Sequence, residues 1–399
     1  MSVSAKPLSL CELSPEDIIA VMTGELRPHP SEVDRVEAMF PSPVVQNHAA
    51  NLCFLPDGTL ACCWFGGTME GMGDISVWLS RLAPGSDRWT QPERLSDRDD
   101  RSEQNPVLWV APDGEVWLFH TSQPGGRQDL CEIYCRRSKD MGRSFGPPFR
   151  LGDVTGVFVR QPPQIGPSGE WLLPGFRCVT PPRGRWTGNL DAAVMLISDD
   201  QGGTWRALDV PDSLGAVHMN PVPAHNGQMP AFYRDRFARA IHRSLSSDGG
   251  LSWSAPQPTD LPNNNSSVQA IRLTDGRIAI VMNPVNASLS DQRRASLYDE
   301  IEGEEEIEAT KGTGGAVWGV PRAPMTLAFS TDNGATFPQR RDLETGSGYC
   351  LTNNSKDGLN KEYSYPSIVQ GPDGALHIAY TYHRRAIKYV RLGGADQGL

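Results

Sequence analysis

The chain has 399 residues, of which 21% are charged and 38% are hydrophobic, and its formal net charge is −10. This composition is typical of a soluble globular protein, and the acidic balance argues against general binding of nucleic acid. No apolar stretch reaches the roughly 18 residues that a membrane span needs, so no membrane partner is expected. Residues 1–13 lack a charged segment followed by an apolar run, which predicts a cytoplasmic protein without a secretory signal.

Residues 1–32 are predicted to form an N-terminal extension with one short helix. The segment from Ser14 to Asp17 comes directly before the apolar residues 18–22, and this pattern is typical of a capped helix. A strand is expected over residues 33–40. Residues 33–399 are predicted to form a single domain.

Six tight turns of the Asp-Gly type divide this domain into short apolar runs. Such turns between strand-like segments are signals of β-hairpins. They recur about every 50 residues, apart from a last interval that is about twice as long. The glycines of these turns are Gly58, Gly114, Gly169, Gly227, Gly276 and Gly374.

A second signature, S-x-D-x-G-x-[ST]-[WF], occurs at residues 138–145, 198–205, 246–253 and 330–337. Its Asp accepts hydrogen bonds from its own turn, its Gly permits a positive φ, and its aromatic ring anchors the turn on a packed sheet. Four copies in one chain indicate an internal repeat. The signature is structural, so it predicts a fold and not an activity.

Each repeat is predicted to contain four antiparallel strands, which is the size of a propeller blade. In the first repeat, strands are expected at residues 48–55, 59–65, 75–81 and around Arg94. The last repeat lacks a fourth strand, and the strand near Val36 would fill that place and close the ring. The predicted fold is therefore all-β, a six-bladed β-propeller, with seven blades as the alternative if the long interval hides a degenerate repeat.

The long interval contains an insertion at about residues 286–321. It includes the acidic run Glu300–Glu308 and a Gly-rich stretch at 311–315. We expect a solvated loop with a flexible tip. A lid over the central site and a dimer contact are the alternatives, and the oligomeric state is left open.

The innermost strands of a propeller all begin at one mouth of the central channel, so the residues at these starts converge in space. All six starts are polar in this sequence, whereas a purely structural propeller needs small or apolar residues there. Together they predict a binding or active site, formed by Asn47, His48, Gln104, Asn105, Arg160, Gln161, His218, Asn220, Asn263, Asn264, Asn265, Tyr363 and Tyr365.

Three of these residues are the candidates for catalysis. His48 suits a general base or acid, and a histidine that caps its strand is the alternative. Arg160 follows three apolar residues and needs a partner, which is either a ligand carboxylate or an internal ion pair. Tyr365 suits a nucleophile or proton donor, or else an aromatic wall that stacks on a sugar.

The other candidates are expected to bind the substrate. Arg234 ends the second strand of its blade and Arg243 lies in the third, and each is either a ligand contact or an ordinary surface charge. Glu70 and Asp74 follow the second strand of the first blade and are candidate carboxylates. The predicted substrate-binding residues are Asn47, Gln104, Gln161, Asn220, Arg234, Arg243, Asn264 and Tyr363.

The sequence contains no phosphate-binding loop, dinucleotide fingerprint or cluster of metal ligands that stands out. The cysteines are expected to be buried free thiols, and Cys131 and Cys135 have no second pair with which to form a zinc site. No cofactor or metal is therefore predicted, with a structural cation in the channel as the alternative.

From about His48 to Arg391, the chain resembles the sialidase-like β-propellers that carry Asp-boxes. The resemblance rests on the four signatures and on residues 64–67, 239–253, 363–369 and 380–384. It implies a propeller that acts on glycans. Sialidases of this superfamily use an Arg triad, an Asp acid/base and a Tyr–Glu nucleophile, but the Phe-Arg-Ile-Pro stretch expected before the first blade is replaced here by residues 41–48.

The strand that starts at His48 looks more like the propeller enzymes that remove terminal L-rhamnose from D-glucuronate by β-elimination. By this resemblance, Arg160 or Arg234 would neutralise the uronate carboxylate and His48 would take the C5 proton. The leading hypothesis is thus a lyase that acts at the non-reducing end of an acidic oligosaccharide. The alternatives are an exo-sialidase, with three arginines on one carboxylate, and a non-catalytic propeller that binds glycans.

Overall fold

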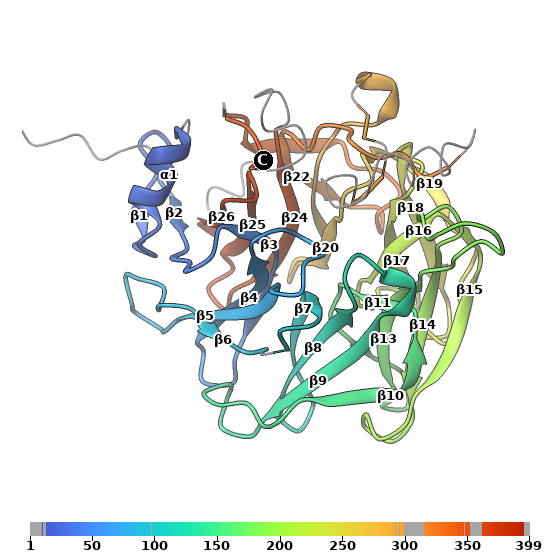
Figure 1. Cartoon of the computed structure of the whole chain (residues 1–399). Helices are drawn as coiled ribbons and strands as arrows, with labels where there is room; N and C mark the ends of the chain where they lie inside the picture. The colour runs from blue at the N-terminus through green and yellow to red at the C-terminus, as the bar shows by residue number, and fades with distance from the viewer. Residues whose placement is uncertain are drawn as a thin grey trace, which may run out of the picture.

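Six antiparallel sheets are arranged as the blades of a β-propeller (Figure 1), which confirms the fold predicted from the repeats. The computed structural model describes residues 10, 13–96, 98–291, 293–294, 296–298, 315–346, 348–351 and 361–394. The acidic run Glu300–Glu308 and most of the Gly-rich stretch lie outside these residues.

The first three blades follow each other in chain order. The first blade consists of β3 (Gln46–Phe54), β4 (Leu60–Gly67), β5 (Ser76–Leu82) and β6 (Glu93–Arg94). The second consists of β7 (Ser102–Val110), β8 (Val116–Gln123), β9 (Glu132–Ser138) and β10 (Phe149–Thr155), with the 3-10 helix η1 (Gln128–Leu130) between β8 and β9. The third consists of β11 (Val157–Val159), β12 (Gln164–Ile165), β13 (Trp171–Arg177), β14 (Ala192–Ser198) and β15 (Arg206–Leu214).

The other three blades complete the ring. The fourth consists of β16 (Ala216–Pro221), β17 (Met229–Asp235), β18 (Ala240–Ser246) and β19 (Gln257–Pro262). The fifth consists of β20 (Gln269–Arg272), β21 (Ile278–Met282), β22 (Met325–Ser330) and β23 (Gln339–Glu344), with η2 (Ala287–Leu289) in its long insertion. The sixth consists of β24 (Tyr363–Gln370), β25 (Leu376–Tyr382), β26 (Ala386–Leu392), β2 (Arg35–Met39) and β1 (Arg27–Pro28).

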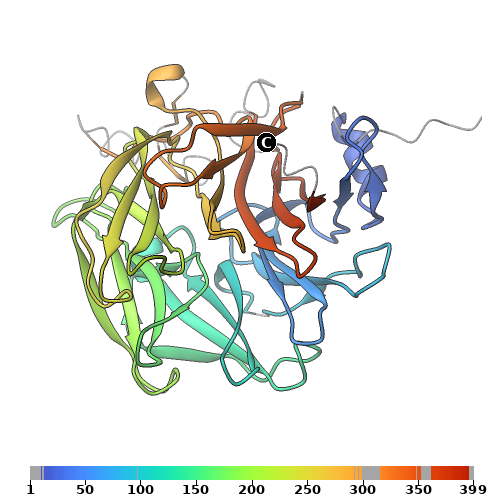
Figure 2. The same cartoon turned by 180° about the vertical axis from the view of Figure 1, so that it is seen from behind.

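The N-terminal strand β2 closes the ring by completing the sixth blade. It pairs with β26 in antiparallel register, from Arg35 opposite Leu392 to Met39 opposite Lys388. Figures 1 and 2 show the blue N-terminal and red C-terminal strands side by side from both directions. This confirms the predicted closure: β2 supplies the fourth strand that the C-terminal part of the sixth blade lacks.

A buried network of charged side chains joins β2, β26 and β23 at this closure. The side chain of Lys388 contacts Glu344 and lies 3.3 Å from Glu37, and Arg35 Nη2 lies 2.5 Å from Glu37 Oε1. Burial alone would raise the pKa of Glu37, but Lys388 and Arg35 outweigh it and hold that pKa below its ordinary value. Because each charge has a partner, the network tolerates its burial.

The helix α1 (Pro15–Val21) forms as predicted. Ser14 Oγ accepts a hydrogen bond from the Asp17 backbone N–H at 3.1 Å, and the Asp17 side chain accepts one from the Ser14 backbone N–H. This reciprocal pair is a capping box. The helix buries Ile18 and Val21 against the sixth and fifth blades and leaves Ile19 exposed.

The hydrophobic core lies between neighbouring blades rather than in the channel. One cluster joins Phe119 of β8 to Leu173 of β13, and another joins Leu79 of β5 to Leu118 of β8. These side chains come from the buried faces of neighbouring stacked sheets, as the alternating strand pattern requires.

Within the described residues, no helix is long and apolar enough to cross a membrane.

The four repeated signatures form the same hydrogen-bonded turn. In the fourth copy, Asp332 Oδ1 accepts hydrogen bonds from the backbone N–H groups of Ala335 and Thr336 at 2.9 and 3.0 Å, and Asp332 Oδ2 accepts one from the Thr336 hydroxyl at 2.6 Å. Gly334 has φ +80°, and a Cβ there would lie 2.3 Å from the Phe232 ring. The turn therefore needs its Asp for hydrogen bonding and its Gly for space and backbone conformation.

We expect Asp332→Ala to lower the free energy of unfolding by about 1–2 kcal/mol, because the turn loses side-chain acceptors for backbone N–H groups. Urea denaturation followed by tryptophan fluorescence measures the change. Asp153→Ala is the matched control, since the Asp153 side chain is fully exposed in its ion pair with Arg150. Equal losses in the two variants would show that the turn hydrogen bonds do not stabilise the blade.

Candidate functional site

The innermost strands begin with a local distortion that aims side chains at the channel mouth. In four of these strands the pairing register shifts after the first residues, at His48–Asn51, Gln104–Val107, Val217–Asn220 and Ser364–Ser367. Such a shift marks a β-bulge. The residues with a positive φ at these starts, including the fifth blade, are Ala49, Asn105, His218, Asn265 and Tyr365.

Tyr365 is the centre of this arrangement. Its φ is 50°, a conformation that costs a bulky residue about 1–3 kcal/mol. Its hydroxyl oxygen accepts a hydrogen bond from Arg234 Nη1 at 2.5 Å. Only 6% of its surface is exposed. Strain of this kind is characteristic of functional positions, where the surrounding structure holds a side chain in place.

Two histidines and three arginines surround the Tyr365 ring. The His48 ring centroid lies 4.2 Å away and the His218 centroid 5.5 Å away. The guanidinium carbons lie 5.5–5.6 Å from the ring centroid, and they belong to Arg160, Arg234 and Arg322. Four different blades and the insertion therefore deliver polar groups to one point.

Two of these arginines are buried without a carboxylate partner among the described residues. Arg160 Nη2 donates to the backbone carbonyls of Ala50, Tyr365 and Pro366 at 2.9–3.1 Å. Arg234 Nε donates to Asn265 Oδ1 at 2.7 Å. Burial lowers the pKa of Arg160 to about 10 and that of Arg234 to about 9, which shows that the charged forms lack full compensation.

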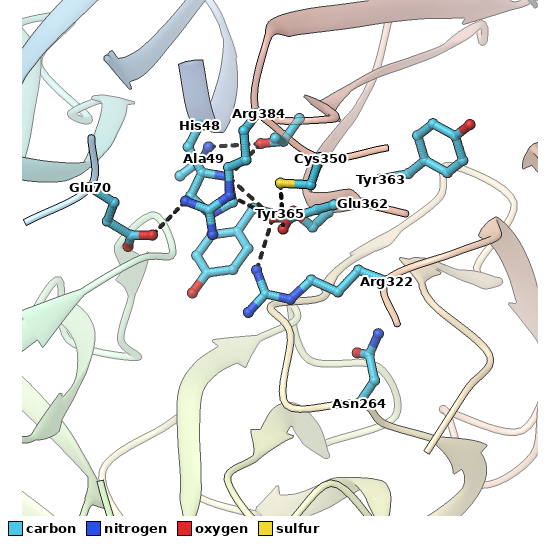
Figure 3. Close-up of polar contacts among 12 residues, drawn as sticks. His48, Ala49, Glu70, Asn264, Arg322, Cys350, Glu362, Tyr363, Tyr365 and Arg384 are labelled. Carbon is cyan, nitrogen blue, oxygen red and sulfur yellow. Dashed lines mark hydrogen bonds and ion pairs between the residues drawn. The ribbon is translucent and has the colours of Figure 1, made fainter. Parts of the chain in front are cut away.

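A carboxylate, Glu362, organises the neighbouring charges. It accepts hydrogen bonds from Arg384 Nε at 2.8 Å, Arg322 Nη1 at 2.9 Å and the Ser364 hydroxyl at 2.6 Å (Figure 3). Burial alone would raise its pKa, but Arg384 and Arg322 outweigh burial and hold the pKa of Glu362 well below its ordinary value. Arg384 also donates to Glu70 at 2.5 Å, so one guanidinium bridges two carboxylates.

His48 is a buried, neutral imidazole beside this cluster. Its Nδ1 lies 2.8 Å from the Thr381 hydroxyl oxygen and 3.8 Å from Glu362. Burial and the charge of Arg384 lower the pKa of His48 well below its ordinary value of 6.5, although Glu362 opposes that shift. Because Nδ1 is engaged by Thr381, Nε2 is the atom with which His48 can meet a ligand.

Several buried polar atoms near Tyr365 have no hydrogen-bond partner in the part of the chain that the structure describes. A buried polar atom without a partner costs free energy, so a group of them indicates space for a polar ligand or water. Asn264 also belongs to this set, although its amide donates to the Pro321 carbonyl at 2.8 Å. The atoms without a partner are His48 Nε2, Arg160 Nη1, His218 Nδ1, Arg234 Nη2 and Asn264 Oδ1.

Other predicted site residues make hydrogen bonds within the protein frame. Asn47 Oδ1 accepts from Trp64 Nε1 at 2.8 Å and from Ser42. Gln161 donates to the Val268 carbonyl and accepts from Gln269 at 2.8 Å.

Two further predicted residues also make hydrogen bonds within the protein. Asn220 Oδ1 accepts from the Ala270 backbone N–H at 2.5 Å, and the buried Gln104 donates to Ser102 at 2.9 Å. The structure therefore gives Asn47, Gln161, Asn220 and Gln104 structural contacts.

Two more predicted residues lie away from the cluster. Arg243 of β18 donates to the Asn333 carbonyl of the next blade's turn at 3.1 Å. The hydroxyl of Tyr363 donates to the Gly346 carbonyl at 2.9 Å, and Figure 3 shows its ring directed away from Glu362. Of the predicted set, the structure brings His48, Arg160, Arg234 and Tyr365 together, and Asn264 contacts the insertion at Pro321.

Three charged residues of the cluster were not in the predicted site. Glu362 precedes Tyr363 by one residue, so its position at the start of β24 was the signal that could have identified it. Arg384 belongs to the turn between β25 and β26, and Arg322 belongs to the insertion. Neither segment begins an innermost strand.

The described part of the insertion packs over the channel mouth. Val317 N–H donates to the Arg236 carbonyl at 2.7 Å, and Asn265 Nδ2 donates to the Val317 carbonyl at 2.8 Å. Trp318 is buried and its ring lies 5.7 Å from the Arg234 guanidinium carbon. This part is packed against the fourth blade, and it places the Arg322 guanidinium carbon 5.5 Å from the Tyr365 ring centroid. The acidic run for which we expected a solvated loop lies outside the described residues. Among the described residues, no group of three or more His, Cys, Asp or Glu side chains is placed to hold a metal ion.

The sequence model of the BNR repeat-like domain matches residues 58–378. A search of curated proteins by sequence gave no match. Among solved structures, the chain is similar to a Hadza microbial sialidase, with 14% identity and a TM-score of 0.65 over 88% of this chain and 66% of that one.

Two further similar structures come from named bacteria. The intramolecular trans-sialidase of Ruminococcus gnavus, in complex with oseltamivir carboxylate, is 12% identical, with a TM-score of 0.62 over 88% of this chain and 95% of that one. The NanB sialidase of Streptococcus pneumoniae is 11% identical, with a TM-score of 0.64 over 96% and 73%. At such identities the likeness establishes the fold, and these matches lend no support to the rhamnosyl-glucuronate lyase branch.

We expect the stability of the fold to decrease as the pH falls below about 6.5, in part because of His218. Burial and Arg234 lower the pKa of His218 well below its ordinary value of 6.5. The unfolded chain therefore takes up a proton there that the folded protein does not, which favours unfolding in acid. His218→Asn removes this contribution, and Asn tolerates the φ of 53° at this position.

Unfolding midpoints measured between pH 7.5 and pH 5 should fall less steeply for His218→Asn than for the wild type. His225→Asn, at an exposed turn, controls for the chemical change alone. Identical slopes for His218→Asn and the wild type would contradict the assignment of a buried neutral imidazole.

Proposed function

Since this chain belongs to the BNR repeat-like domain family, we propose that it is a glycoside hydrolase that removes a terminal, carboxylate-bearing sugar in the manner of a sialidase. The observation that supports this proposal is the pair of buried guanidinium groups without a carboxylate beside Tyr365. Arg160 Nη1 and Arg234 Nη2 have no hydrogen-bond partner in the described ranges. A carboxylate on the substrate would supply the missing negative charge and accept their hydrogen bonds.

The sugar ring would then lie against Tyr365. In the proposed reaction, the Tyr365 hydroxyl gives its proton to the neutral His48 imidazole and its oxygen forms a bond to the anomeric carbon. The bond from that carbon to the leaving oxygen breaks, and His48 passes the proton to that oxygen. Arg234 Nη1 donates to the Tyr365 oxygen, so negative charge on that oxygen is stabilised during attack. Water subsequently cleaves the bond between sugar and tyrosine and restores the enzyme.

We assign His48 as the general acid, which gives a proton to the leaving oxygen. Its Nε2 has no hydrogen-bond partner among the described residues, and its ring centroid lies 4.2 Å from that of Tyr365. A bound carboxylate adds negative charge beside the imidazole and so favours its protonated form. Glu362 is a positioning residue in this scheme, because its hydrogen bonds hold Arg322 and Arg384.

The same groups also fit the elimination that we inferred from the sequence. That reaction requires a base and a phenol beside arginines that neutralise a uronate, and the rings of His48 and Tyr365 have centroids 4.2 Å apart. The solved structures that resemble this chain include several sialidases, and we therefore place hydrolysis first. The products distinguish the two reactions.

The decisive experiment incubates the protein with sialyl-lactose and, separately, with rhamnosyl-glucuronate oligosaccharides. Release of free sialic acid supports the proposal. Formation of an unsaturated uronate, detected by its ultraviolet absorbance, would replace hydrolysis by elimination. Saturable binding of both sugars without turnover would make the protein a non-catalytic glycan-binding propeller.

We expect Tyr365→Phe to lower kcat on the order of 1000-fold, because the variant lacks the nucleophilic oxygen. Binding of the intact substrate, measured by calorimetry, should change much less than kcat. Tyr134→Phe, at a partly exposed tyrosine that stacks on His120, is the matched control and should retain activity. A Tyr365→Phe enzyme with wild-type kcat would remove Tyr365 from the chemistry.

We expect small carboxylates such as N-acetylneuraminate to raise the unfolding temperature of the wild type but not that of Arg234→Gln. The ligand charge compensates a buried guanidinium that otherwise lacks a partner. For the same reason Arg234→Gln should be at least as stable as the wild type without ligand. Arg272→Lys, which alters an arginine bound to the Pro223 carbonyl, should keep the response, and a neutral sugar should give none in any variant.

A further inference from the structure

An open cavity lies beside α1, apart from the cluster around Tyr365. Its volume is about 610 Å³, which is in the range of small-molecule sites. It is enclosed by α1, the segment that joins β2 to β3, and the turn between β25 and β26. The lining includes Ile19, Met22, Val44, Val45, Leu351 and Arg385.

The wall of this cavity is aliphatic. Apart from Ser42, Gln91 and Arg385, its lining residues are aliphatic or proline. Ile19 is 76% exposed and Val45 is 60% exposed, so apolar surface faces water at the rim. A ligand with a hydrocarbon chain would remove this surface from water.

One end of the cavity carries an uncompensated positive charge. The Arg385 guanidinium lies 5.4 Å from the centroid of the Tyr349 ring. It forms no ion pair with a described carboxylate, and its Nε is buried without a hydrogen-bond partner. The adjacent Arg384, in contrast, is paired with both Glu362 and Glu70.

Arg385 is held in place by its backbone. Its carbonyl accepts a hydrogen bond from Asn47 Nδ2 at 2.9 Å. Arg384 has φ 61°, and this conformation turns the chain between the two arginines. Neighbouring residues thus serve different sites: Arg384 faces the carboxylates at the channel mouth, and Arg385 faces the cavity.

We propose that this cavity is a second binding site, for a soluble aliphatic carboxylate. The hydrocarbon chain lies against Ile19, Val44 and Leu351, and the carboxylate pairs with Arg385. The site does not depend on the proposed hydrolase activity, because none of the described residues around Tyr365 lines the cavity.

Calorimetric titration of the whole protein with hexanoate, octanoate and decanoate, below micellar concentrations, tests this proposal. We expect one site, with affinity rising about fourfold for each added methylene group. Decanol, which has the same chain without the charge, should bind at least tenfold more weakly than decanoate, because Arg385 gains no partner.

Two variants separate this cavity from the reaction centre. Arg385→Gln should remove the preference for decanoate over decanol, and Val45→Asp should weaken both ligands. Arg234→Gln should bind decanoate as the wild type does. This last result remains informative even if the protein proves not to be a hydrolase.

Three outcomes would overturn the proposal. The first is equal affinity for decanoate and decanol in the wild type. The second is unchanged decanoate binding in Arg385→Gln, or its loss in Arg234→Gln, which would place the anion at Tyr365. The third is sedimentation with anionic phospholipid vesicles, abolished in Arg385→Gln, without binding of free decanoate; this would assign the cavity to a lipid surface.

Discussion

A guanidinium group that is withdrawn from water needs negative charge or hydrogen-bond acceptors in return, and this requirement shapes the mouth of the channel. Arg384 and Arg322 obtain it from Glu362, and Arg236 obtains it from Asp191 at 2.7 Å. Arg160 and Arg234 receive only neutral carbonyl, amide and hydroxyl oxygens from the described residues. Two positive charges thus remain without a carboxylate partner among the described residues, and in the proposed function an anion bound beside Tyr365 would offset the free energy that their burial costs.

The propeller supplies the rigidity that such an arrangement requires. Blades packed through large apolar side chains fix the strand starts, and the bulges rotate individual side chains out of the ladder. Tyr365 can therefore remain at a φ of 50° without local relaxation. The insertion between β21 and β22 adds Arg322 and Trp318 to the candidate site. The site therefore combines residues from the repeated blades with residues from a segment that the other described blades lack.

The fold was predictable because its determinants are local and repeated: four Asp-box turns, six hairpin glycines and a missing last strand. The site was predictable only in part. Polar residues at strand starts have two uses, and the sequence does not separate them. Asn220 and Gln269 satisfy backbone N–H groups of neighbouring blades, whereas His48 and Arg234 keep atoms free for a ligand. Arg322 could not be found from repeats, because the insertion interrupts the pattern, and Arg384 lies in a turn whose direction depends on tertiary packing.

The pairing of β2 with β26 has a consequence for cotranslational folding. Residue 35 is synthesised early, yet its partner strand emerges only after about 350 further residues, and a contact of such sequence separation forms late. Until then the sixth blade presents an unpaired edge, which is open to pairing with a neighbouring nascent chain. Lys388 of β26 finds Glu37 of β2 and Glu344 of β23 only in the closed ring, and this would make a premature or foreign pairing poorer than the correct one.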